Sequence, residues 1–595
     1  MDDQNKNLIL ATALSFAVIL VWFLLFPPPE APATDPNAPA AVADATAPVV
    51  PAATAPADAA LPAETQEVSD APRLDIDTPR VHGSISLQGG RIDQLSLKDY
   101  KETIDPDSDI VTMLSPVGSE DAYYALFGWA AGTGISPEDV PGPNTLWSVQ
   151  SGTILTPDSP VTLSWDNGKG QTFRRVISID DNYMFAIEQS VTNAGTGSVS
   201  LAPYGILARH GEPSNAKKFF ILHEGTVGLA DSELTETSYG DLEDLDFNAR
   251  EGARAEVTQV TDTGWIGFTD HYWMSTLIPS GGTPFKSAIK YDERRDIFQA
   301  EAVQPTQTVA VGATVTSNTQ LFAGAKEWET IRNYENAGVA KFVDSIDWGW
   351  FFFLTKPIFQ LLHFLHGFIG NMGWSIIALT IVIKAVVFPL AYKSYASMAK
   401  MKELQPKMEE LKKAAGDDRA KVQQGMMELY KKEKVNPASG CLPILIQIPI
   451  FFSLYKVIFV TLELRHAPWV GWINDLSSPD PSSILNLFGL LPYATPSPDS
   501  IFAIVSLGIL PILLGISMWL QQKLNPAPTD ATQAMIFAWM PWVFMFMLGS
   551  FASGLVLYWI TNNTITFLQQ YMIMRGHGYK PDVFGNIVSS FKRKK

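Results

Sequence analysis

Six apolar stretches, each roughly 20 residues long, constrain this chain more than any other feature of its sequence. A helix that crosses a bilayer needs about 20 mostly apolar residues, so the sequence predicts six membrane-spanning helices. The first stretch is longer than the apolar core of a signal peptide, and Asp2 and Asp3 spoil a basic N-terminal region, so we expect an uncleaved anchor. The six stretches are Leu8–Phe26, Ser375–Tyr392, Leu442–Leu462, Ile501–Leu520, Ala534–Phe551 and Gly554–Met574.

Positive charge lies in two places along the chain, although the formal net charge is -18. Lysines are dense in residues 393–436, after the second stretch, and the tail 575–595 ends in "FKRKK". Because lysine and arginine near span ends favour the cytoplasmic side, we expect both segments and both termini in the cytoplasm. The overall acidity argues against nucleic acid as a general partner. Cys441 is the only cysteine, which excludes an intrachain disulfide and a thiolate metal cluster.

Composition divides the chain further. Residues 27–72 are rich in alanine and proline and cannot bury a core, so they read as a linker. Residues 73–340 show apolar residues at alternate positions between glycine-rich turns, which predicts a β-sandwich, and we expect it outside the membrane. We find no catalytic grouping there, and its scattered histidines lack metal-ligand spacing. The expected order is 1–26 (stub and first span), 27–72 (linker), 73–340 (sandwich), 341–370 (interfacial amphipathic helix) and 371–595 (five further spans, a cytoplasmic hairpin at 393–436 and a basic tail at 575–595).

The interfacial helix is predicted from residues 341–370, where Lys356, Gln360 and His363 fall on one side among many aromatic residues. Trp348 and Trp350 are typical of the boundary between water and lipid.

Lys384 lies near the middle of the second apolar stretch, about 15 Å from its start and so near half the depth of the hydrocarbon layer. A charge at that depth costs about 3 kcal/mol or more and should face a bundle interior or a wet cavity. The six stretches offer no internal carboxylate, only uncharged polar groups, so the lysine is either cationic and solvated or neutral. It could also serve only to pin helices together. The polar neighbours expected around it are Gln447, Tyr558, Thr561, Asn562 and Asn563.

A methionine-rich helical hairpin is predicted just inside the membrane. Apolar residues recur at spacings of three and four on both sides of a turn at Gly416-Asp417-Asp418. The stripe could be an ordinary two-helix seam. A hairpin with so many lysines beside a membrane could also meet anionic lipid or a client chain, to which flexible methionine can adapt. The residues expected to recruit a client are Met401, Leu404, Met408, Leu411, Met426 and Leu429.

Four segments carry a resemblance to a known family: "NPASGCLPILIQIPIFFSLYKVI", "LELRHAPWVGWINDLSSPDP", "FAWMPWVF" and "SGLVLYWITNNTITFLQQYMIMR". Together they resemble the YidC family of membrane protein insertases over roughly residues 348–575, and the anchor with its exported sandwich resembles the Gram-negative branch. The family usually carries arginine where Lys384 stands. This is a difference in kind, since lysine can lose its proton when desolvated and arginine effectively cannot.

The resemblance implies a non-enzymatic insertase and chaperone of the bacterial inner membrane, without metal or cofactor. It implies a hydrophilic groove, open to the cytoplasm and to lipid, that takes a client's polar segment while the client's apolar helix slides along the third and fifth spans. Implied partners are nascent membrane proteins, the lipid bilayer and the Sec translocon (SecYEG, SecDF). The basic tail could also approach ribosomal RNA.

Two other functions compete with this one. A secondary transporter with a lysine-containing substrate site is the main alternative, although such proteins normally use intramembrane acids. An intramembrane hydrolase built on Ser375 and Lys384 is disfavoured, because nine residues place them about 13 Å apart along a helix.

Overall fold

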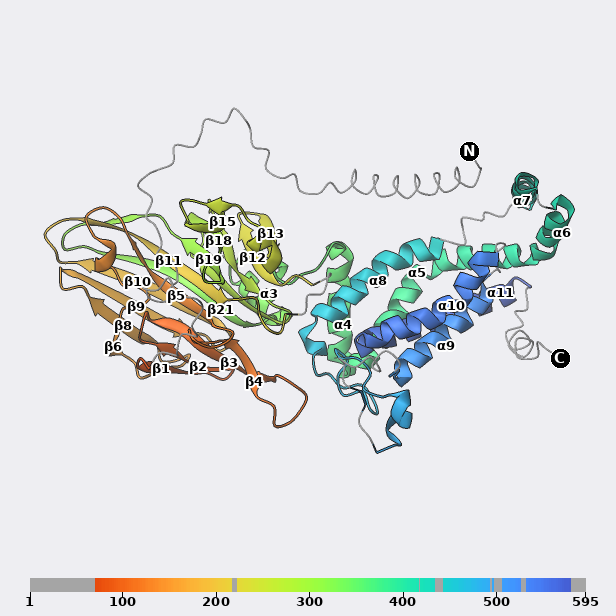
Figure 1. The fold of residues 1–595 in the computed structure, drawn as a ribbon, viewed down its shortest axis with the longest axis horizontal. Helices are drawn as coiled ribbons and strands as arrows, with labels where there is room; N and C mark the ends of the chain where they lie inside the picture. Colours follow the sequence, from red (N-terminus) through yellow and green to blue (C-terminus); the bar gives the residue numbers. More distant parts are fainter. Residues whose placement is uncertain are drawn as a thin grey trace, which may run out of the picture. The chain divides into compact units, whose positions relative to one another are not determined.

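The computed structural model describes residues 70–216, 222–416, 418–433, 442–492, 495–496, 506–525 and 531–578 (Figure 1). All of them belong to one compact unit. The predicted first span and the linker, as well as the tail beyond residue 578, lie outside the described residues.

Residues 73–325 form two β-sheets, which confirms the predicted β-rich domain. The strands alternate buried and more exposed positions, as in β9, so each sheet turns one apolar face toward the shared core. The larger sheet contains β1 (Arg73–Asp77), β2 (Val81–Ser86), β3 (Arg91–Lys101), β4 (Ile110–Leu114), β5 (Tyr123–Ala131), β7 (Ile154–Leu155), β11 (Val199–His210), β14 (Phe247–Asn248), β15 (Ala253–Val260), β18 (Phe285–Asp292), β19 (Ile297–Val303) and β20 (Gln307–Val309). The smaller sheet contains β6 (Ser148–Ser151), β8 (Val161–Asp166), β9 (Gln171–Ile179), β10 (Met184–Asn193), β12 (Gly225–Ala230), β13 (Glu233–Ser238), β16 (Gly264–Thr269), β17 (Trp273–Pro279) and β21 (Thr314–Ala325).

The order of strands in the larger sheet is β14-β15-β18-β19-β11-β5-β3-β2-β1-β7, with β20 paired to β11 and β4 to β3. The smaller sheet runs β13-β12-β16-β17-β21-β10-β9-β8-β6. Neighbours pair antiparallel, except β1 and β7. Short helices η1 (Pro137–Asp139), α2 (Tyr239–Glu243), α3 (Trp328–Asn336) and η2 (Phe342–Ser345) decorate the domain.

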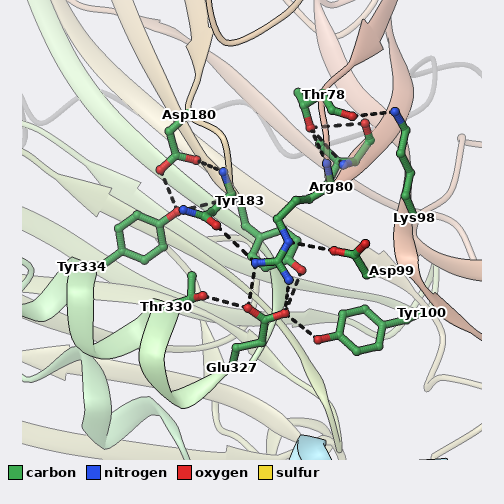
Figure 2. A network of polar contacts seen from close by, with 12 residues as sticks. Thr78, Arg80, Lys98, Asp99, Tyr100, Asp180, Tyr183, Glu327, Thr330 and Tyr334 are labelled. Atoms are coloured by element: carbon green, nitrogen blue, oxygen red, sulfur yellow. Dashed lines mark hydrogen bonds and ion pairs between the residues drawn. The ribbon is translucent and has the colours of Figure 1, made fainter.

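A polar network around Glu327 ties both sheets to helix α3 (Figure 2). Glu327, the residue before α3, accepts hydrogen bonds from Arg80 Nη1 at 2.8 Å, Thr330 Oγ1 at 2.7 Å and Tyr183 OH at 3.1 Å. Arg80 precedes β2 of the larger sheet and Tyr183 precedes β10 of the smaller one. The network therefore joins three elements that are far apart in the sequence.

We expect Glu327→Gln to remove part of the stability that this chain loses in acid. Burial alone would raise the pKa of Glu327, but hydrogen bonds from Arg80, Tyr100 and Thr330 hold it below its ordinary 4.5. A depressed pKa contributes stability above the unfolded value and loses it as the pH falls through the folded value. The variant should be less stable by about 1–3 kcal/mol near neutral pH, with a gap that closes below about pH 4.5. Melting of the whole chain in detergent, with the exposed Glu256→Gln as control, measures this.

The remaining described chain is helical. Its elements are α4 (Phe352–Ile369), α5 (Met372–Glu403), α6 (Gln405–Ala415), α7 (Arg419–Lys432), α8 (Leu442–Val460), η4 (Leu462–Leu464), η5 (Ile484–Gly489), α9 (Ile509–Leu524), α10 (Ala531–Met547), η7 (Leu548–Ser550) and α11 (Ser553–Gly576). Helix α11 packs on α5 and α9, α10 packs on α9, and α4 packs on α5 and α8. Pro389, Pro449 and Pro541 lie within α5, α8 and α10.

Two predicted boundaries need correction. The fourth apolar stretch was predicted to begin at Ile501, whereas helix α9 begins at Ile509 because Gly508 is extended and Asp480 caps the first turn. The predicted interfacial helix likewise starts only at Phe352, after η2 and a turn with Gly349 at a φ of 68°. Trp348 is buried against Phe359, so of the two boundary tryptophans only Trp350 is exposed.

Candidate functional site: a lysine among uncharged polar groups

Helix α5 carries Lys384 into the packed region between three helices. Asn371 caps the helix by accepting the N–H of Trp374 at 3.1 Å, and an apolar run follows. Lys384 is only 8% exposed and donates to Gln447 Oε1 on α8 at 3.2 Å and to Thr566 Oγ1 on α11 at 2.9 Å. Both acceptors are uncharged, and within the described ranges no carboxylate forms an ion pair with this lysine. The amine of Lys384 therefore lies among amide and hydroxyl dipoles.

Gln447 extends this network to a second residue of α11. Its Nε2 donates to Tyr558 OH at 2.8 Å, and Tyr558 is almost fully buried. On the other branch, Thr566 donates to the backbone carbonyl of Asn562 at 2.6 Å. Three helices thus meet through one continuous set of hydrogen bonds, as a polar cluster in a low-dielectric region requires.

The other predicted residues lie near this network but differ in their contacts. Asn563 donates to Ser517 Oγ on α9 at 3.1 Å, which brings a fourth helix to the cluster. Asn562 is buried, and its Oδ1 has no hydrogen-bond partner among the residues that the structure describes. Thr561 donates back to the carbonyl of Leu557 at 2.8 Å and does not join the lysine. Five of the six predicted residues therefore lie in or beside this network, whereas the Thr561 hydroxyl bonds to the backbone of its own helix.

Sequence reasoning missed Thr566 and Ser517. The spacing held a signal for Thr566, because it lies four residues after Asn562 and eight after Tyr558, on one face of a helix. Ser517 had no comparable signal, since a single serine in an apolar helix usually bonds its own backbone. Here its hydroxyl does donate to the carbonyl of Leu514 at 2.7 Å while it accepts from Asn563.

Lys456 is, after Lys384, the second buried lysine of the described helical region, and it lies nine residues after Gln447 on α8. It is buried and forms an ion pair with Asp347. Asp347 also accepts the N–H of His223 at 2.9 Å and of Gly349 at 3.1 Å. Burial acts to raise the pKa of Asp347, but the positive charge of Lys456 outweighs it and keeps this pKa below its ordinary value. Lys456 is thus paired with a carboxylate, whereas the described hydrogen bonds of Lys384 go to uncharged groups.

Helices α6 and α7 pack as the predicted hairpin. A Cβ on Gly425 would lie 2.4 Å from Leu411, so the two helices approach closely at this glycine. Tyr430 OH lies 3.7 Å from Met408 Sδ, and Lys407 pairs with Glu433 at 2.8 Å. Leu411, Met426 and Leu429 are half-buried along the seam, whereas Met427 is exposed.

Two predicted hairpin residues lie elsewhere. Met401 is on α5 and packs against Tyr395, Met398 and Ile573, and Leu404 is the buried residue between α5 and α6. Pro406 starts α6 afresh, which explains why the apolar pattern continues across a helix boundary.

The helical region has the length and apolarity of a membrane protein. Phe352–Ile369 and Met372–Glu403 are long and apolar enough to cross a bilayer, and Gln447–Val460, Ile509–Leu524 and Met535–Ser550 are shorter apolar helices. Large apolar side chains are exposed along α5, α8 and α10, for example Val386, Phe452 and Trp539. Apolar helices around a buried polar cluster, joined to a β-rich domain, are the arrangement expected of a helical membrane protein with a β-rich domain.

Comparisons with known proteins identify the family. The model of the YidC periplasmic domain matches residues 73–361, and that of the 60Kd inner membrane protein matches residues 364–580. Over all of this chain, proteins called membrane protein insertase YidC are 67% identical in Roseobacter denitrificans, 66% in Ruegeria pomeroyi and 68% in a further Ruegeria species, each covered to 99% of its length. This chain therefore belongs to the YidC family, as its sequence motifs indicated.

Proposed function

We propose that the Lys384 network is the working site of a membrane protein insertase. The relatives that match the whole chain are named membrane protein insertases, and this is the function of the present protein, which acts without enzymatic chemistry. It is an inner membrane protein with a periplasmic domain. Nothing observed supports the alternative of a secondary transporter.

The proposed mechanism moves a polar segment of a client partway across the bilayer. Such a segment would move from water to the amides, hydroxyls and positive charge of the Lys384 network, and not into hydrocarbon. The polar surroundings lower the desolvation penalty of the segment. The Oδ1 of Asn562 supports this proposal. It is a buried acceptor without a hydrogen-bond partner among the described residues, so it can accept a hydrogen bond from a client or from water. The observation that carries the proposal is the buried lysine held by uncharged groups of α8 and α11.

The energy would come from the client's own apolar helix as it enters lipid. The exposed apolar side chains of α8 and α10, including Ile448, Phe452, Ile536, Trp539 and Val543, offer a path along which that helix can slide. Burial of apolar surface gives about 25 cal/mol per Å², so a spanning helix supplies ample driving force.

We further propose six spans with both termini in the cytoplasm, with α4 lying on the outer membrane surface. The lysine-rich hairpin and tail support the cytoplasmic side. The amphipathic arrangement of α4 supports its position, since Ile358, Phe359 and Leu362 are buried while Phe364 and Phe368 are exposed. Cooperation with the Sec translocon and contact of the basic tail with ribosomal RNA belong to the same proposal.

Reconstitution tests the function. Purified protein in liposomes is expected to insert a short membrane protein with an acidic translocated tail, so that the tail becomes protected from external protease. Empty liposomes provide the baseline. Protection equal to this baseline would contradict the assignment, and solute uptake coupled to an ion gradient would favour the transporter.

The hairpin makes a separate prediction. A photo-crosslinking residue at exposed Met427, or at half-buried Met408, is expected to label a nascent client, because flexible thioethers offer an adaptable apolar surface. The same residue at Met401 serves as the matched control, since Met401 lies on α5 and packs against Ile573 of α11. Equal labelling at all three positions, or none at Met427 and Met408, would leave the hairpin a purely structural element.

A further inference from the structure

The chain between α8 and α9 carries a short apolar segment, residues 484–492, which we call the outer projection. The residue that begins this segment is bonded to the chain just before α9. Ile484 N–H donates to Leu507 O at 2.8 Å, and the hydroxyls of Ser483 and Ser506 lie 2.7 Å apart. The described residues on either side of this stretch, Ser483 and Ile484 before it and Ser506 and Leu507 after it, therefore lie side by side and form the base of the projection.

Asp480 fixes this base to the start of α9. Its Oδ2 accepts the N–H of Leu510 at 2.8 Å and so caps the helix, while its Oδ1 accepts the indole N–H of Trp472 at 2.9 Å. A Cβ on Gly508 would lie 2.5 Å from the carboxyl carbon of Asp480, so only glycine fits there. The projection is thus attached rigidly to the first turn of α9.

Tryptophans surround this attachment point. Trp472 is partly exposed, and the neighbouring Trp469 packs against Trp374 at the start of α5, with ring centroids 5.6 Å apart. Tryptophan gathers at the boundary between water and lipid. The base of the projection therefore lies at the level of this boundary, at one end of α5 and α9.

The projection itself presents apolar side chains outward. Ile484, Leu487, Phe488 and Leu490 are all exposed, and Leu490 is 83% exposed. Between Pro481 and Ile509 the only charged residue is Asp499. Leu487 and Phe488 both have positive φ, at 51° and 58°, a conformation that large residues rarely adopt. This backbone conformation costs free energy, and apolar side chains exposed to water would not offset that cost. Contact of the same side chains with lipid would offset it.

We propose that the outer projection embeds in the outer leaflet of the bilayer and holds the start of α9 at a fixed depth. This anchor goes beyond the insertase function. It depends only on the position of the projection at the tryptophan level, and not on what the Lys384 network does. The absence of lysine, arginine and glutamate from the segment favours lipid over a charged protein partner.

Depth-dependent fluorescence quenching tests the proposal. In a Cys441→Ser background, the full chain carries a single fluorophore at Leu490→Cys and is placed in phosphatidylcholine vesicles that contain nitroxide-labelled lipid. We expect lipid quenching several-fold stronger than for a fluorophore at Leu146→Cys, an exposed apolar position of the β domain, together with weaker quenching by aqueous iodide. Leu487→Ser with Phe488→Ser should bring the Leu490 fluorophore toward the Leu146 values.

Two outcomes would overturn the proposal. Iodide quenching at Leu490 as strong as at Leu146 would place the projection in water. Shielding from both quenchers would show that protein covers it instead of lipid. Because the assay requires no client, its failure is independent of the reconstitution experiment.

Discussion

Replacing Lys384 with glutamate is expected to reduce insertion of an acidic-tailed client at least about tenfold, which corresponds to about 1.4 kcal/mol. The reversed charge would repel the acidic segment in a region where low dielectric strengthens electrostatic interactions. It would also lose the donation to Gln447 and Thr566. Depletion of the native protein, followed by rescue with the variant, measures insertion as protease protection of the tail.

Matched variants distinguish an effect of the charge at position 384 from an effect on folding. Lys384→Arg should retain most insertion, since arginine keeps the charge, and Lys384→Ala should be intermediate. Lys393→Glu makes the same charge change at an exposed position on the same helix and should behave like wild type. Insertion of a client with an uncharged tail should decrease less in the Lys384→Glu variant than insertion of the acidic client does. Full rescue of the acidic client by Lys384→Glu would rule out charge attraction as the mechanism.

The second large effect is expected at Asp347. Asp347→Asn leaves Lys456 as a buried cation without its counter-charge, and breaking a buried ion pair in this way costs about 3–5 kcal/mol. The single carbonyl oxygen of the asparagine can accept the N–H of Gly349 but not also that of His223, which Asp347 receives on its other oxygen. The loss therefore combines the missing charge with one missing acceptor. A lower apparent melting temperature in detergent, followed by tryptophan fluorescence, is the expected result.

A second substitution should restore stability. Lys456→Met combined with Asp347→Asn removes both charges and keeps the volume of the side chain, and such replacements of buried pairs are often neutral. The double variant should melt close to the wild type, whereas each single variant should melt well below it. Additive losses in the double variant would show that the two residues act independently.

The polar cluster could be predicted from the sequence because its members are polar residues within apolar stretches, which can be recognised without knowing their contacts. A lysine in an apolar stretch must find polar groups, and Gln447 and Tyr558 were among the few available. The β-rich domain was predictable from alternation, which follows directly from burial of one face of a strand.

Other features depended on contacts that no local pattern encodes. Lys456 and Asp347 are 109 residues apart, so nothing near either residue indicated an ion pair. The position of Met401 was misread because the apolar spacing continues from α5 into the hairpin, although Pro406 marks the new helix. The start of α9 was misplaced because Asp480, a distant cap, decides where the first turn forms.

The prolines inside α5, α8 and α10 have a consequence for where these helices can bend. Each proline lacks an N–H and so leaves the carbonyl four residues before it without its usual helical donor. In α10 the carbonyl of Phe537 accepts instead from the side chain of Gln522 on α9, across the helix interface. The corresponding carbonyls in α5 and α8 belong to Ala385 and Leu445, beside Lys384 and close to Gln447. A helix can bend at such a point without breaking a backbone hydrogen bond, so α5 and α8 can change direction beside Lys384 and Gln447 at little cost.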